Sequence, residues 1–259
     1  VPFHMWSPDA YEGAPTVVTG FMSTGVKAAA VAAFARVFLS ALGPMVADWT
    51  PVLWVIAVAT MVVGTVVGVS QTSLKRMLAY SSIAHAGYLL VAIIAANDMG
   101  KASLLFYLAS YAVTNLGAFG VIALLGSREH ANDDLRDYAG LARSHPALAL
   151  LMTVFLLSLG GFPPTAGFIA KWYTFSAAVS AGYYGLAIIG MLSSVVSVYF
   201  YLRIVVMMYM SERDARPVPP QISGLAMAGL VASVLAVLYL GVLPAQMIAW
   251  AEQSISTIF

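Results

Sequence analysis

The chain has 259 residues, of which 61% are hydrophobic and 9% are charged, and its formal net charge is +1. Soluble domains carry about 25% charged residues, so the composition excludes an ordinary soluble domain and predicts an all-α polytopic membrane protein. The near-neutral charge argues against nucleic-acid binding. Because the sequence has no cysteine, disulfides, thiolate metal sites and iron–sulfur ligation are excluded in this chain.

The first residues, VPFHMWSPDAYEGAP, precede the first apolar stretch, and no starting methionine or signal peptide stands before them. We therefore expect the chain to be a piece of a longer protein. Apolar stretches near the length that crosses a bilayer, about 20 residues, then follow one another. We place the spans, within a single transmembrane domain over 1–259, at about 16–41, 51–70, 77–96, 102–126, 147–179, 183–210 and 222–243.

The first span contains Lys27, which lies eleven residues inside it, or about 16 Å at 1.5 Å per residue. A charge near the midplane costs at least about 2.5–3.5 kcal/mol, and our spans contain no Asp or Glu to offset it. We interpret Lys27 as a group whose protonation changes during function. The alternative is a permanent pair with a carboxylate on a segment absent from this chain. Arg36 and Arg203 lie near span ends, where they can reach the interface.

The third span contains His85, with Ser81 one turn earlier on the same face and Ser82 beside it. Histidine titrates near neutral pH, so His85 is a candidate proton relay. A histidine with a purely structural role in the core is the alternative. Asn115 in the fourth span can either hydrogen-bond water or hold two helices together.

The fifth span is too long for one simple crossing, and glycine and proline residues interrupt it. Proline removes a backbone donor, so we expect two half-helices around a break that survives only inside protein or beside water. The break contains Gly160, Gly161, Pro163, Pro164 and Gly167. Lys171 follows the break directly, which favours a place on a hydrated path; a lysine reaching for the outer interface is the alternative.

Basic residues in the connections fall mostly on one side of the membrane. The side that carries residues 1–15 has seven of them, against only Lys101 on the opposite side: Lys75, Arg76, Arg128, Arg136, Arg143, Arg213 and Arg216. By the positive-inside rule this side is expected to be cytoplasmic and the C-terminus to lie outside. The sequence also has no glycine-rich phosphate loop and no metal-ligand spacing, so proton transfer is the chemistry that remains.

Three stretches in order, "VPFHMWSPDAYEGAP", "QTSLKRMLAYSSIAHAGYLL" and "LSLGGFPPTAGFIAKWY", carry a resemblance. They resemble the antiporter-like membrane subunits of proton-pumping NADH-quinone oxidoreductase, respiratory complex I, and among these the subunit N (subunit 2) type. Subunits L and M have their central lysine on the helix that corresponds to our fourth span, where this chain has Asn115. Subunit N places it at the position of Lys27. Subunit M typically has glutamate where Lys171 stands.

The resemblance implies that the spans are the C-terminal half of an antiporter-like fold and contain its second inverted repeat, with one broken helix. It implies a proton path with Lys27 as the central storage site and Lys171 as the distal site. His85 would connect them, with Ser81, Ser82 and Asn115 as a secondary polar path. No catalytic, cofactor-binding or metal residues are expected in this chain.

The same resemblance implies that NADH, FMN, iron–sulfur clusters and quinone bind to other subunits. The expected partners are the lipid bilayer and complex I membrane subunits of the M, L, K, J and A types, most naturally in a bacterial inner membrane. Two other functions remain open. A subunit of a multi-subunit sodium/proton antiporter shares the fold, and a structural spacer subunit would not need Lys27 for pumping.

Overall fold

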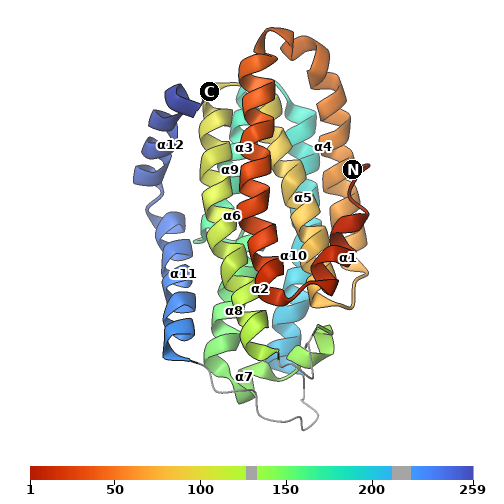
Figure 1. Ribbon diagram of the computed structural model, residues 1–259, viewed down its shortest axis with the longest axis vertical. Coiled ribbons are helices and arrows are strands. Elements are labelled where there is room, and N and C mark those ends of the chain that lie inside the picture. The colour runs from red at the N-terminus through yellow and green to blue at the C-terminus, as the bar shows by residue number, and fades with distance from the viewer. Residues whose placement is uncertain (127–132, 212–222, 259) are drawn as a thin grey trace.

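The computed structural model describes residues 1–126, 133–211 and 223–258. Within these ranges the regular elements are helices, and most run side by side along the long axis of the molecule (Figure 1). The α-helices are α1 (Trp6–Gly13), α2 (Thr16–Phe21), α3 (Lys27–Arg36), α4 (Val46–Val69), α5 (Leu74–Ala95), α6 (Asp98–Leu125), α7 (Leu141–Ser144), α8 (Pro146–Gly160), α9 (Ala166–Ser180), α10 (Tyr184–Met210), α11 (Gly224–Val242) and α12 (Ala245–Ile258). The short π-helical segments are η1 (Met22–Val26) and η2 (Val37–Ala41), and the short 3₁₀ segments are η3 (Gly43–Met45) and η4 (Leu135–Tyr138).

Six helical stretches in the described residues are long and apolar enough to cross a membrane, which confirms the predicted class. The first of them is composite, because the π-helical turns η1 and η2 interrupt it between Thr16 and Ala41. Large apolar side chains such as Val195 and Leu235 remain more than half exposed. Exposed apolar surface on this scale fits a hydrocarbon surrounding.

Two helices begin earlier than the spans that we drew, and each of them includes an acidic residue in its first turn. Helix α4 begins at Val46 instead of residue 51 and so includes Asp48, and α6 begins at Asp98 instead of residue 102. A carboxylate in the first turn is favourable because it faces the positive end of the helix dipole. Both carboxylates therefore lie at a span end and away from the midplane.

The predicted break in the fifth span is confirmed. Helix α8 ends at Gly160 and α9 begins at Ala166, so the fifth span consists of two 15-residue halves. Gly161 turns the chain with φ of 85°, a conformation that favours glycine. Gly167 lets the halves meet, because a Cβ there would lie 1.8 Å from the carbonyl oxygen of Ser158.

Helix α5 is the central element and packs against α4, α9, α1 and α6. Most of its residues are buried, including His85, Ser81 and Ser82. Helix α11 lies at the edge of the bundle and packs against α6, α9 and α8 (Figure 1). Helix α12, which our spans do not include, follows it and contacts α6.

Part of the predicted charge asymmetry can be placed. Ser73 and Asp134 form an antiparallel bridge, so the start of α5 and the segment leading to η4 and α7 lie at one end of the bundle. Lys75, Arg136 and Arg143 belong to this end. Arg128, Arg213, Arg216 and the expected first residue of the last span, 222, lie outside the described residues.

Candidate functional site

Lys27 points into the bundle from the first residue of α3. Its ammonium Nζ donates to the Ser82 carbonyl oxygen at 2.8 Å, to the Ser82 hydroxyl, and to the Tyr111 hydroxyl at 3.0 Å. The half-buried residue borders a cavity of about 370 Å³ that is also lined by His4 and Tyr11. In the part of the chain that the structure describes, no carboxylate lies within ion-pair distance of it.

The π-helical turn η1 immediately precedes Lys27. Such a turn inserts extra residues per turn and rotates all that follows it around the helix axis. The direction in which Lys27 points therefore depends on a local distortion. Regular helical spacing of the sequence does not predict it.

Tyr111 connects Lys27 with His85. The Lys27 Nζ lies 4.4 Å from the centre of the Tyr111 ring, close enough for a cation–π interaction. The same ring lies 5.0 Å from the His85 ring, measured between centres. The predicted pair of Lys27 and His85 is thus joined through a tyrosine on α6.

His85 has a hydroxyl at each ring nitrogen. Its Nδ1 lies 2.6 Å from the Tyr107 hydroxyl, and its Nε2 lies 3.4 Å from the Tyr201 hydroxyl. Tyr201 in turn lies 2.5 Å from the Ser81 hydroxyl, so Ser81 reaches His85 through Tyr201. A neutral histidine carries one donor and one acceptor nitrogen, and hydroxyls can serve both.

Lys171 faces the interior and is 5% exposed. Its Nζ donates to the carbonyl oxygens of Leu159 at 2.8 Å and Gly160 at 3.0 Å, and to the Ser194 hydroxyl at 2.8 Å. The break leaves carbonyls at the end of α8 without helical partners, and the ammonium satisfies them. This geometry excludes the alternative in which Lys171 extends to the outer interface.

Tyr88 connects Lys171 with His85 in the same manner as Tyr111 connects Lys27. The Lys171 Nζ lies 5.3 Å from the centre of the Tyr88 ring, and this ring meets His85 edge-on at 5.5 Å. Lys171 also borders a cavity of about 640 Å³ between α9 and α10. Among the described residues, no carboxylate pairs with Lys171.

Polar groups also meet at the break. The hydroxyls of Thr114 and Ser158 lie 3.1 Å apart, and Ser158 Oγ accepts from the Gly167 amide at 3.2 Å. Asn115 is 1% exposed, and its Nδ2 has no hydrogen-bond partner among the described residues. The structure therefore brings Ser82 to Lys27 and Ser81 towards His85, but it gives the Asn115 Nδ2 no such partner.

The sequence reasoning missed a group of tyrosines that surround His85. Their shared feature is a phenol placed in an apolar span: Tyr88, Tyr107, Tyr111 and Tyr201. Helical spacing gave a signal, because Tyr107 and Tyr111 are four residues apart and Tyr88 is three residues from His85. Among the described residues no group of three His, Asp or Glu side chains could hold a metal ion. The arrangement is suited to exchanging protons between two lysines.

Comparisons with known proteins identify the family to which the chain is similar. The profile of the family described as "NADH:quinone oxidoreductase/Mrp antiporter, TM" matches residues 1–197. The NADH-quinone oxidoreductase subunit N of Trichlorobacter lovleyi is 49% identical over 257 residues, which are 99% of this chain and 53% of that protein. Subunit N 2 of Rhizobium meliloti is 46% identical over 98% of this chain and 53% of its own length. The chain thus spans about half the length of these curated relatives.

Two solved structures show the fold. A chain of respiratory complex I from Thermus thermophilus with bound aureothin superposes with a TM-score of 0.84 at 37% identity, over 96% of this chain and 54% of that one. A chain of the Mrp complex from Dietzia sp. superposes with a TM-score of 0.90 at 23% identity, over 100% of this chain and 56% of that one. At that lower identity, the second similarity establishes the fold alone.

Proposed function

The chain belongs to the NADH:quinone oxidoreductase/Mrp antiporter transmembrane family, and on this premise we propose that it is the proton-translocating part of a subunit N in NADH-quinone oxidoreductase. The names of relatives at 42–49% identity support the subunit type. The observation that carries the proposal is the pair of lysines, Lys27 and Lys171, which are joined through His85 by two tyrosine rings.

In this proposal Lys27 stores the proton, His85 relays it, and Lys171 is the distal site. The hydroxyls of Ser82 and Tyr111 accept from the Lys27 ammonium, so they stabilise its charged form. At Lys171 the two carbonyl oxygens and Ser194 do the same. A lysine without a carboxylate partner can lose its proton without leaving an unpaired buried anion, which a permanent ion pair would not allow.

Electrostatic repulsion between the two lysines lets the charge of one control the protonation of the other. Two like charges within a bundle of low dielectric repel one another far more strongly than in water. A proton that arrives at one lysine therefore lowers the proton affinity of the other. A redox reaction elsewhere in the complex needs only to change the charge at one end of this series in order to move protons along it.

In this proposal the redox cofactors and the quinone bind to other subunits of the complex. We place NADH, FMN, the iron–sulfur clusters and quinone on other subunits, and membrane subunits of the M, L, K, J and A types as neighbours. The end of the bundle that carries Lys75, Arg136 and Arg143 is assigned to the cytoplasm of a bacterium by the positive-inside rule. The C-terminus then lies outside.

The test is NADH-driven proton transport in inverted membrane vesicles that contain the whole complex. Lys27→Ala should abolish most of the transport while the complex assembles, and Lys101→Ala is the matched control because Lys101 pairs with Asp98 at a span end. Transport should be independent of sodium. Normal pumping by Lys27→Ala would indicate a structural spacer, and sodium-dependent transport would indicate a sodium/proton antiporter.

A further inference from the structure

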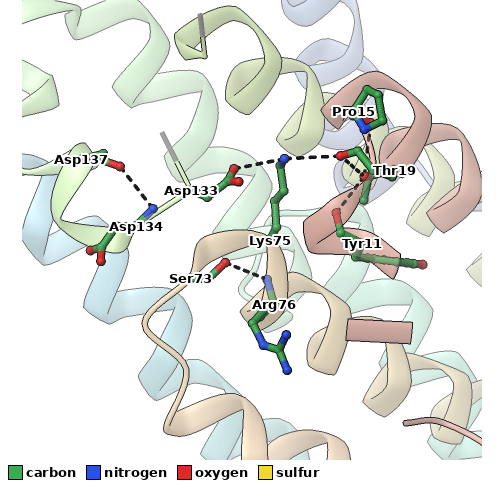
Figure 2. Close-up of polar contacts among 10 residues, drawn as sticks. Tyr11, Pro15, Thr19, Ser73, Lys75, Arg76, Asp133, Asp134 and Asp137 are labelled. Carbon is green, nitrogen blue, oxygen red and sulfur yellow. Dashed lines mark hydrogen bonds and ion pairs between the residues drawn. The ribbon is translucent and has the colours of Figure 1, made fainter. Parts of the chain in front are cut away.

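Lys75 is a buried cation at an unfavourable place. It lies in the first turn of α5 and is 4% exposed, although the start of a helix favours negative charge. Its Nζ lies 3.2 Å from Asp133 Oδ1 and 3.5 Å from the carbonyl oxygen of Ala14 (Figure 2). Asp133 is held there by the chain, since its own carbonyl oxygen accepts from the Leu74 amide at 2.6 Å. Lys75 thus joins α5, the 133–138 segment and the turn between α1 and α2.

That turn leads to the Lys27 site. The Thr19 hydroxyl lies 3.5 Å from the Ala14 carbonyl oxygen and donates to the Tyr11 carbonyl oxygen at 3.0 Å (Figure 2). At the other end of Tyr11, its hydroxyl lies 3.2 Å from the Ser82 hydroxyl. Ser82 is the partner of Lys27. A continuous series of contacts therefore runs from Asp133 to the proposed proton-storage site.

The route along this series is closed. Lys75 and Ser82 are seven residues apart on the same face of α5, which separates them by about 10 Å along the helix. Tyr11 is 4% exposed and meets the Phe119 ring edge-on at 6.2 Å. The cavity beside Lys27 is also lined by Ser82 and Tyr11, but its lining includes neither Lys75 nor residues 14–19. On the side of Lys75, Tyr11 and the turn after it therefore have to move before water from this end of the bundle can reach Ser82.

We propose that the Lys75–Asp133 ion pair is a latch that holds residues 14–19 and Tyr11 closed over Ser82, and that its release admits the water through which Lys27 takes up a proton from this end. The latch opens when Asp133 binds a proton, because the neutral carboxyl no longer attracts the ammonium of Lys75. The proton then passes from the Asp133 carboxyl to the entering water, which restores the carboxylate. This inference rests on the proposed proton path and concerns its entrance.

The surroundings of the pair favour proton uptake by Asp133. Burial raises the pKa of Asp133 above its ordinary value, Lys75 opposes this shift, and the charges of Glu12 and Asp137 add to it. Arg76 on the next position of α5 is neutralised by Asp9 and Glu12 at 2.6 and 2.9 Å.

Two further groups face this region, and neither replaces Lys75. From α10, Arg203 reaches the carbonyl oxygen of Gln71 at 3.3 Å. Tyr138 of η4 is buried, and burial raises its pKa, so it stays neutral.

The test measures entry of a small charged reagent independently of pumping. Ser23 is 0% exposed and lies between Thr19 and Lys27 in the first span, and the sequence has no cysteine of its own. Ser23→Cys in the whole complex is treated with 2-(trimethylammonium)ethyl methanethiosulfonate in inverted vesicles. The labelling rate is divided by that of Ser70→Cys, which is exposed at the same end. This ratio removes the effect of pH on thiol reactivity.

We expect Asp133→Asn to raise this ratio by up to about fivefold, the change that follows from losing one ion pair of ordinary strength. Asp133→Asn leaves the buried Lys75 ammonium without its partner, which could by itself disturb folding. The double variant Lys75→Met with Asp133→Asn has no such charge, and its Ser23→Cys thiol should be labelled as fast as in Asp133→Asn. The control Asp9→Asn removes a carboxylate that also joins α1 to α5 but does not touch Lys75, and it should label slowly.

The pH dependence separates a latch from a mere structural clamp. In the parent the ratio should rise as pH falls, because Asp133 becomes protonated, and in Asp133→Asn it should be high and independent of pH. A ratio that Asp133→Asn leaves unchanged, or that Asp9→Asn raises equally, overturns the latch. If labelling behaves as expected but Lys27→Ala pumps normally, the proposed function fails while the latch stands.

Discussion

Lys27 donates to the Tyr111 hydroxyl at 3.0 Å while its Nζ also lies 4.4 Å from the centre of the Tyr111 ring. Tyr111 therefore stabilises the ammonium in two ways, and its ring lies tilted against the His85 ring with 5.0 Å between the ring centres. Hydrogen bonds to charged groups are stronger than those between neutral groups. The contact with Tyr111 therefore affects how tightly Lys27 holds its proton.

Tyr111→Phe should slow NADH-driven proton transport by about tenfold or more, because a hydrogen bond to a charged group contributes about 1.5–3 kcal/mol. The ring stays, so assembly should be normal. Tyr239→Phe is the control, since Tyr239 is 48% exposed on α11. Transport at the parent rate in Tyr111→Phe would remove Tyr111 from the path.

Lys27→Arg should fail to pump although arginine keeps the positive charge. A guanidinium can donate to Ser82 and Tyr111 in place of the ammonium, but it does not lose its proton at any working pH. The measurement is proton transport per quinone reduced in inverted vesicles. Pumping at the parent ratio would show that the charge alone, and not its change, is needed.

Lys171→Ala should lower the pumping rate, and Lys171→Glu should retain more activity than Lys171→Ala. A protonated glutamic acid can donate to the carbonyl oxygen of Leu159 or Gly160 and accept from Ser194, whereas alanine leaves these groups unpaired. Equal rates for the two variants would contradict an exchangeable proton at this position.

Gly167→Ala should prevent stable assembly, at a cost of about 3 kcal/mol or more from overpacking. The added Cβ would lie 1.8 Å from the Ser158 carbonyl oxygen, and backbone cannot move aside as a side chain can. Gly185→Ala is the matched control, because nothing lies within 4 Å of a Cβ there. The amount of assembled complex after mild detergent extraction measures both.

The sequence by itself determined the membrane class, the approximate positions of most spans and the break. Hydrocarbon accepts few polar groups, so apolar length marks each crossing and a Gly–Pro cluster marks the interruption. The same scarcity of charge singled out Lys27 and Lys171 as candidates. The sequence did not indicate where α4 and α6 begin, because an acidic residue in the first turn of a helix resembles a loop residue in a hydropathy pattern.

Only the tertiary structure decided how the candidates are connected. A tyrosine in an apolar span is as compatible with packing as with proton transfer, so Tyr111 and Tyr88 gained a role only when their rings were found between the lysines and His85. Likewise the pairing of Lys75 with Asp133 joins residues 58 positions apart in the sequence. Local patterns are set by neighbours along the chain, whereas contacts between helices depend on how the whole bundle packs.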